Sequence, residues 1–170
     1  MNTEFNNEPI NHEMGKDLSR RRLMNHMSEY TTSKSLFFVL HLNHYLQKEK
    51  NEPHKIKKSL KKFFKSIDNE VFSKKSNKQL RRYVVIENLK KRGSTHVQSV
   101  IEIPQHLNSV ALKNIIKRNL NEQIVRLEHS ETVEKKKGGH KGLIDYNTKD
   151  INDFETNVFA FDEVNSYKFG

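Results

Sequence analysis

The chain contains no cysteine among its 170 residues, so neither disulfide bonds nor thiolate chemistry can contribute to its fold or its function. It also lacks a run of 18 apolar residues and a signal-peptide pattern at its start, the features that mark membrane-spanning and secreted chains. Together these absences favour an intracellular compartment. The phosphate-binding pattern GxxxxGK[ST] is missing as well, which excludes a P-loop nucleotidase from this sequence.

The charge balance is one-sided. The chain has 31 lysine and arginine residues against 21 aspartate and glutamate residues, a formal charge of +10 with an isoelectric point near 9.7. Such a surplus predicts a polyanionic partner, for which nucleic acid and anionic membrane surfaces compete. The hydrophobic content of 34% is modest, but it is concentrated in a few segments, as a single domain with a small core requires.

The first 32 residues form a polar, basic N-terminal tail that we expect to be partly disordered. The first fifteen are rich in asparagine and glutamate, a composition typical of disorder. Residues 16–29 suit a short helix carrying Arg20, Arg21 and Arg22, which form either a solvated face or a DNA contact. We expect one folded domain over residues 33–170, because no boundary and no internal repeat interrupts it.

Apolar spacing along this domain predicts alternating strands and helices. The expected strands cover 36–42, 83–87, 95–104, 123–133 and 158–161, and the expected helices cover 56–67, 109–120 and 143–151. Asn108 or Ser109 is the expected N-cap of the second helix. The order β-α-β-β-α-β, followed by a further helix, predicts an α+β fold of the ferredoxin-like, split βαβ type. Its antiparallel sheet would carry two helices on one face.

The two middle strands of this order are joined by a basic loop with Lys90, Lys91 and Arg92. A symmetric loop places Glu87 opposite His96 on the neighbouring strand, at about 5 Å between Cβ atoms.

The same pairing places Val85 opposite Gln98. Because strand side chains alternate between faces, Glu87, His96 and Gln98 converge on one side of the sheet. A carboxylate, an imidazole and an amide oxygen form a ligand set that suits Mg²⁺ or Mn²⁺.

The two expected helices cover the opposite side, which carries Val97, Ile101 and Ile103. We therefore expect the side with the ligand-type residues to be open, with Tyr83 as its main aromatic residue.

The segment after the glycine-containing stretch KKKGGHKG offers a nucleophile. Tyr146 and Lys149 are spaced i, i+3 and share one face of the expected third helix. A tyrosine hydroxyl can attack phosphorus and form a covalent phosphotyrosine, and a lysine can stabilise the developing negative charge. The glycines would let this helix move towards and away from the metal.

Three motifs along residues 35–150 resemble those of the HUH-type nicking endonucleases. Leu40–His44 (LHLNH) stands where that family commonly has FTLNN on its first strand. His96–Gln98 (HVQ) resembles the family's His-hydrophobic-His or His-Leu-Gln motif, with Glu87 in the place of the acidic ligand, and Tyr146–Lys149 matches YxxK. The nearest resemblance is to the single-tyrosine nuclease domain of rolling-circle replication initiators from circular single-stranded DNA viruses and plasmids.

This resemblance implies a DNA endonuclease and strand transferase. Tyr146, assisted by Lys149, would attack the scissile phosphate and become linked to the 5′ end. The released 3′ hydroxyl would prime rolling-circle replication, and the reverse reaction would rejoin ends without ATP. Glu87, His96 and Gln98 would hold Mn²⁺ or Mg²⁺, which polarises the phosphate.

The resemblance also implies the partner. Single-stranded DNA, as an origin hairpin or an exposed origin strand, would contact Asn43, His41 and the basic loop of Lys90, Lys91 and Arg92. The missing P-loop makes the chain either a stand-alone nuclease that relies on a host helicase or a part of a longer initiator. The compartment would be the cytoplasm of a bacterial host, or the nucleus for a eukaryotic virus. A membrane partner is not expected.

Two other functions fit the same residues. A non-catalytic ferredoxin-like module could bind single-stranded nucleic acid across its open sheet, as RNA-recognition sheets do with exposed aromatics. A single-tyrosine transposase of the HUH superfamily would use the same motifs. In the first case Glu87, His96 and Gln98 are ordinary polar residues of a solvated sheet, and Tyr146 is an ordinary surface tyrosine.

Overall fold

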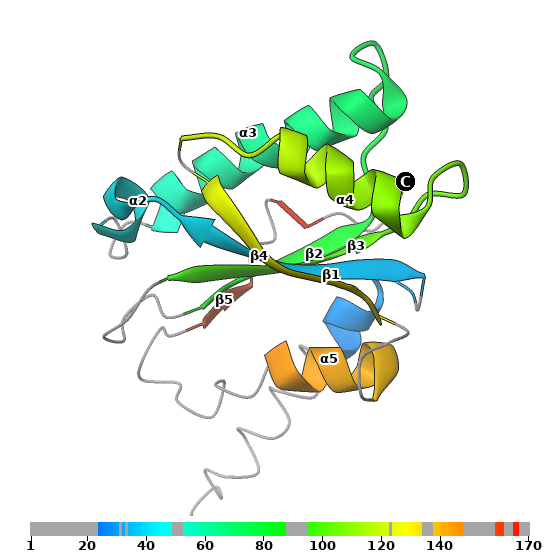
Figure 1. The fold of residues 1–170 in the computed structure, drawn as a ribbon. Helices are drawn as coiled ribbons and strands as arrows, with labels where there is room; N and C mark the ends of the chain where they lie inside the picture. The colour runs from blue at the N-terminus through cyan, green and yellow to red at the C-terminus, as the bar shows by residue number, and fades with distance from the viewer. Residues whose placement is uncertain are drawn as a thin grey trace, which may run out of the picture.

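The computed structural model describes residues 24–30, 32, 34–48, 53–87, 95–122, 124–133, 138–147, 159–161 and 165–166. The fold is α+β, built on one open five-stranded antiparallel sheet in the order β4-β1-β3-β2-β5 (Figure 1). The strands are β1 (Ser35–Leu42), β2 (Arg82–Glu87), β3 (His96–Glu102), β4 (Ile124–Thr132) and β5 (Phe159–Phe161). The helices are α2 (His44–Lys48), α3 (Pro53–Phe72), α4 (Ser109–Arg118) and α5 (Gly139–Asn147). None of these described helices is long and apolar enough to cross a bilayer.

Helices α3 and α4 cover one face of the sheet, as the sequence predicts (Figure 1). Their apolar residues recur at helical spacing and form one buried stripe on each helix. The N-cap of α4 is Asn108, whose side chain accepts a hydrogen bond from the Ala111 N–H at 2.8 Å, an interaction worth about 1 kcal/mol. The buried helical residues of this first core are Ile56, Leu60, Phe63, Phe64, Ile67, Leu112, Ile115 and Ile116.

A second apolar core lies on the other face of the sheet, so the expectation that this face is open is wrong over most of β1, β2 and β3. Leu143 and Ile144 of α5 and Met27 and Tyr30 of the N-terminal segment pack there. These residues cover the strand residues Phe37, Val39, Tyr83, Val85 and Val100.

Tyr83 is 0% exposed, which contradicts its expected role as an exposed aromatic. The reason is visible in β2, where the apolar residues from Tyr83 to Ile86 are all buried. A continuous apolar run, rather than an alternating one, is typical of a strand covered on both faces.

The start of α5 lies at Gly139, four residues before the predicted start at Leu143. The sequence KKKGGHKG favours a flexible linker, but two of its glycines instead form the entry to the helix. Gly138 and Gly139 have φ values of +80° and +56°, in the left-handed region that glycine adopts without steric cost. The Gly142 N–H donates to the Gly138 carbonyl at 3.0 Å, which fixes the first turn. This turn places Leu143 and Ile144 against the sheet.

A buried ion pair joins β2, α3 and the C-terminal residues. Arg82 Nη1 donates to both carboxylate oxygens of Asp68, at 2.8 and 3.0 Å. Arg82 Nε donates to the Asn165 carbonyl at 2.9 Å, and the Asn165 amide donates to the Lys57 carbonyl at 2.8 Å. The Arg82 guanidinium also lies 4.7 Å from the centre of the Phe64 ring. These bonds hold Asn165, which is itself buried, against the outer edge of β2.

Candidate functional site

The pairing of β2 with β3 is the one that the sequence predicts. Glu87 lies opposite His96, and Val85 lies opposite Gln98. Directly opposed residues of an antiparallel pair point to the same face, so the carboxylate of Glu87 and the imidazole of His96 are neighbours. Both residues are half-buried at the end of the ladder. The backbone therefore brings together two of the three predicted metal ligands.

The other neighbour of His96 is a second histidine. Strand β1 pairs with β3 so that His41 lies opposite His96. The two imidazole ring centres are 4.6 Å apart, and the ring planes are nearly perpendicular, at 87°. His41, predicted as a DNA contact, is thus in direct contact with a predicted metal ligand.

This pairing continues across the whole sheet. Arg126 of β4 lies opposite His41, and Phe159 of β5 lies opposite Glu87. The row Arg126, His41, His96 and Glu87 places an ionisable side chain on each of four adjacent strands, all on one face; we call it the polar row. Strand geometry alone sets about 5 Å between neighbours in such a row.

Gln98 occupies the next position on the same face. It lies between Val39 of β1 and Val85 of β2 and is only 4% exposed. Among the residues that the structure describes, none donates a hydrogen bond to its Oε1 atom, which is buried. Leaving a buried carbonyl oxygen without a donor costs about 1–3 kcal/mol, and a cation is one partner that would satisfy it.

The donor types on this face suit Mg²⁺ or Mn²⁺: a carboxylate, imidazoles and an amide oxygen. The unsatisfied Gln98 oxygen is the observation that favours a metal there. The side chains do not form a complete metal-coordination site. In the described ranges, no group of three or more histidine, aspartate or glutamate side chains is placed to hold a metal ion. A bound cation would thus draw on Gln98 in addition to the Glu87 carboxylate and the neutral His96 imidazole.

Asn43, predicted as a DNA contact, has a structural role. Its Oδ1 accepts a hydrogen bond from the Leu46 N–H at 2.9 Å and caps α2, while its Nδ2 donates to the Glu122 carbonyl at 2.6 Å. Asn43 therefore ties the end of β1 to the segment that leads into β4. Among the described residues, no acceptor takes the second N–H of its amide, which could contact nucleic acid.

Tyr146 belongs to the last turn of α5, the helix whose Leu143 and Ile144 cover the face that carries His96 and Gln98. The position of its side chain is outside the described part of the chain. Lys149, Lys90, Lys91 and Arg92 lie outside the described residues altogether. The structure thus places the tyrosine-bearing helix over the predicted face, and the approach of the hydroxyl to the polar row stays a prediction.

Two features of the site were not found from the sequence. Arg126 belongs to the polar row, and His41 contacts His96. The pairing of β4 with β1 is irregular between Val39 and Leu40 and again between His41 and Leu42. Because each irregularity shifts the register, no pattern in the sequence could have aligned Arg126 with His41.

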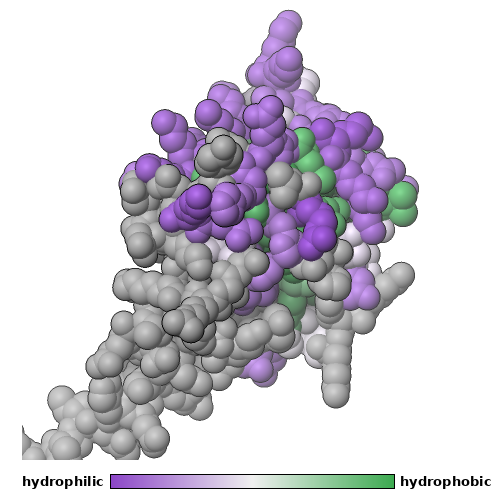
Figure 2. Space-filling model, turned by 60° about the vertical axis from the view of Figure 1, so that its left-hand side comes forward, coloured by the Kyte–Doolittle hydropathy of each residue, from purple (hydrophilic) through white to green (hydrophobic). Residues whose placement is uncertain are grey.

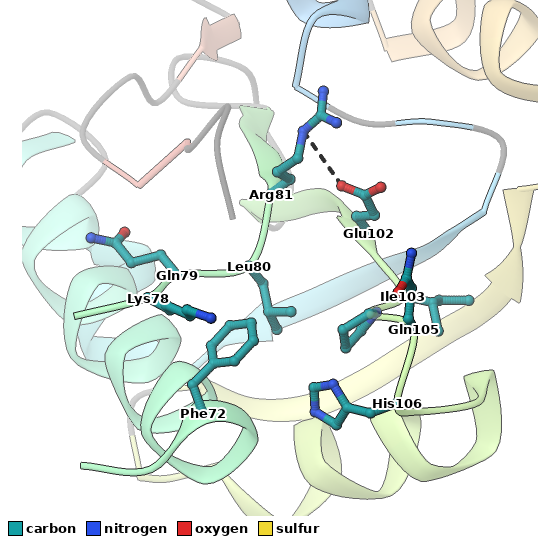
Figure 3. Close-up of a pocket in the computed structure, with 10 residues that line it drawn as sticks. Phe72, Lys78, Gln79, Leu80, Arg81, Glu102, Ile103, Gln105 and His106 are labelled. Atoms are coloured by element: carbon teal, nitrogen blue, oxygen red, sulfur yellow. Dashed lines mark ion pairs between the residues drawn. The ribbon is translucent and has the colours of Figure 1, made fainter. Parts of the chain in front are cut away.

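A cavity of about 630 Å³ lies at the opposite end of the β2–β3 pair (Figure 3). Its lining includes Phe72, Leu80 and Ile103, and one side is closed by Arg81, whose Nε lies 3.4 Å from the Glu102 carboxylate. No residue predicted for the site lines this cavity. The candidate site is therefore the polar row with Gln98, at the other end of the strands.

Comparison with known proteins yielded no relative: no protein-family model, no curated protein and no solved structure matches this chain.

Proposed function

We propose that this protein is a metal-dependent, single-tyrosine nuclease of the HUH type, which nicks and rejoins single-stranded DNA to initiate rolling-circle replication. The observation that carries the proposal is the pairing of Glu87 with His96 and of Val85 with Gln98. This pairing puts the carboxylate, the imidazole and the unsatisfied amide oxygen on one face, under the helix that contains Tyr146.

The arrangement of the chain supports a ferredoxin-like assignment for residues 35–132. The strand order β4-β1-β3-β2 alternates in direction, and the connections through α3 and α4 both lie on one face (Figure 1). These are the features of a split βαβ sheet. Strand β5 and helix α5 are additions to that core, and α5 would carry the nucleophile to the other face.

The proposed chemistry starts with binding and orientation. Glu87, His96 and Gln98 would hold Mn²⁺ or Mg²⁺, which when bound supplies a Lewis acid that polarises the scissile phosphate. His41 packs against His96 and would fix the orientation of that ring. Arg126 is exposed beside His41 and would attract the DNA backbone to this end of the sheet.

The covalent step would be an in-line displacement at phosphorus. The Tyr146 hydroxyl gives its proton to solvent as its oxygen forms a bond to the phosphorus, and the bond from phosphorus to the 3′ oxygen breaks. The departing 3′ oxygen takes up a proton, and Lys149 balances the charge that develops on the phosphate. Running the same step backwards rejoins the strand, because the phosphotyrosine keeps the energy of the broken bond.

A labelled-oligonucleotide assay tests this function. The protein would be incubated with a sequence-diverse pool of single-stranded DNA labelled at either end, with Mn²⁺ or with a chelator, beside Tyr146→Phe. We expect an adduct that survives SDS, depends on Mn²⁺, carries the fragment 3′ of the nick and is absent in the variant. Salt-sensitive binding to the pool without any adduct would reject the nuclease.

A transposase of the same superfamily would give the same adduct and differ only in its target sequences. The non-catalytic binding module would need exposed aromatics for base stacking, and Tyr83, the main aromatic residue expected on this face, is fully buried. The single-stranded DNA nuclease is therefore the function that the described residues support best.

A further inference from the structure

The positive charge of this protein is concentrated away from the candidate site. Residues 53–79 contain nine lysines and only two acidic residues, a net charge of +7 out of the formal +10 of the whole chain. Most of this segment is α3, which lies on the face of the sheet opposite to α5 (Figure 1). Nothing in the proposed nicking reaction uses this surface.

Both acidic residues of the segment already have cationic partners. Asp68 is buried with Arg82, and Glu70 accepts hydrogen bonds from Arg118 and Asn119. The hydrogen bond from Arg118 holds the pKa of Glu70 below its usual value, so this carboxylate is ionised beside Arg118 at neutral pH. The lysines are therefore left without carboxylates from their own segment.

The lysines at the solvent side of α3 follow helical spacing. Lys58, Lys61, Lys62 and Lys65 are exposed and lie on one side of the helix, because residues three and four apart are neighbours. Within the described parts of the chain no carboxylate forms an ion pair with any of these four. A row of like charges on one helix face is destabilising unless an anion offsets it.

A groove runs beside this row, between α3 and the segment that leads back to β2. It has a volume of about 410 Å³, and Lys61, Lys65 and Lys78 line it above the buried Arg82. The lining also includes Asp68, whose carboxylate is paired with Arg82. The other lining residues are neutral and polar: Asn69, Ser76, Asn77, Gln79 and Asn165. Lysine combined with amides and hydroxyls is the side-chain chemistry that contacts phosphate and sugar in nucleic-acid complexes.

In its described residues, the same surface lacks the exposed aromatic and apolar side chains that would bind single-stranded nucleic acid or a membrane. Hydrophilic residues cover most of the upper part of the molecule, where α3 and α4 lie (Figure 2). Among the described residues, the only large hydrophobic side chain that is exposed is Val110 on α4. Single-stranded nucleic acid is bound by stacking on aromatics, and membrane-surface helices insert apolar side chains. A basic helix without exposed aromatic or large apolar side chains is better suited to binding the phosphate backbone of a duplex.

We propose that the outer face of α3 and the groove beside it bind the phosphate backbone of a nucleic-acid duplex. Helix α3 has 20 residues and is therefore about 30 Å long, close to one turn of B-form DNA, which is about 34–36 Å. This binding surface is separate from the nicking site. The protein would hold a duplex on one side of its sheet and process a single strand on the other.

Binding to a 20-base-pair duplex of arbitrary sequence tests this proposal. Fluorescence anisotropy would be measured over a series of salt concentrations with a metal chelator present, so that nicking cannot contribute. We expect Lys61→Gln with Lys65→Gln to weaken duplex binding on the order of tenfold and to reduce the slope of log K against log salt by about 2, about 1 for each lost phosphate contact. The matched control is Lys34→Gln with Lys117→Gln, two exposed lysines elsewhere, for which we expect less than half of that change.

Three results would overturn the proposal. Equal losses in the two double variants would mean that only net charge matters. An equal or larger loss for a single strand of the same length would assign the groove to single strands. Stronger binding to vesicles with 30% phosphatidylserine, lost in Lys61→Gln with Lys65→Gln, would assign it to membranes. Tyr146→Phe should keep full duplex binding, so failure of the nicking proposal and failure of this one are distinguishable.

Discussion

Gln98 has a buried side-chain oxygen that folding alone does not explain. The residue lies between two valines in the sheet, its Oε1 atom is buried, and no donor to that atom exists among the described residues. Ser99, the next residue, faces the first core and also has a buried oxygen without a hydrogen bond in the described part of the structure. Both residues thus have a buried oxygen without a hydrogen bond, on opposite faces of β3. Of the two, only Gln98 lies beside the polar row.

We expect Gln98→Leu to separate stability from function. The substitution removes an unsatisfied buried carbonyl, so the free energy of unfolding should stay level or rise by about 1 kcal/mol. Mn²⁺ affinity, measured by calorimetry, should fall by about 10- to 100-fold, and nicking should fall with it. Ser99→Ala is the control and should leave Mn²⁺ affinity unchanged. A Gln98→Leu protein that binds Mn²⁺ normally would remove Gln98 from the ligand set.

At the scale of single elements, the entry to α5 depends on two adjacent glycines that differ in their surroundings. A Cβ on Gly138 would lie 3.1 Å from Gly142 Cα, whereas a Cβ on Gly139 would meet nothing within 4 Å. Both glycines have positive φ, so each alanine substitution is strained. Only at Gly138 does the added methyl group also press on the first turn of the helix.

Gly139→Ala should cost about 1–2 kcal/mol, the penalty of a left-handed conformation for an L-residue. Gly138→Ala should cost more, because the helix must also shift to relieve the contact. Urea unfolding of the two variants would measure the difference. Equal losses of stability would show that the close approach of Gly138 to Gly142 is relieved without cost.

The β2–β3 pair shows how far the sequence predicts local structure. Its strands are separated by a short loop, so a symmetric connection is enough to fix Glu87 opposite His96. Helices α3 and α4 follow from apolar spacing, and the N-cap of α4 is Asn108, one of the two caps that the sequence predicts. The pairing of His41 with His96 joins segments more than fifty residues apart, and only packing of the whole sheet sets that register.

At the scale of the whole molecule, the sheet is covered on both faces. The expectation of one open face, drawn from the sequence, is therefore wrong. Prediction placed one helical layer on the sheet and left the other face open. The apolar residues Leu143 and Ile144 are too few to reveal a docking helix by themselves, and Met27 and Tyr30 lie in a segment whose composition indicates a tail. Burial of this face depends on several distant segments together.

The Arg82–Asp68 pair is a buried polar contact that links β2 to α3. Arg82→Met would leave the Asp68 carboxylate buried without its cation, so we expect a loss of about 3–5 kcal/mol in the free energy of unfolding. Combining it with Asp68→Leu should recover part of the loss. Arg118→Gln, which breaks the exposed pair with Glu70, should cost less than about 1 kcal/mol. Denaturant titration of the four proteins would decide, and an equally small loss for Arg82→Met would contradict this assignment.

Strand β5 and Ser166 have a consequence for how the protein behaves among copies of itself. Strand β2 is mostly apolar, and its outer edge is covered by C-terminal residues. Strand β5 pairs with Val85 to Glu87, and the Ser166 hydroxyl accepts a hydrogen bond from the Val84 N–H at 3.0 Å. Unpaired edges of such strands are templates for aggregation. Because β5 and Ser166 occupy this edge, we expect them to prevent β2 from pairing with a strand of another molecule.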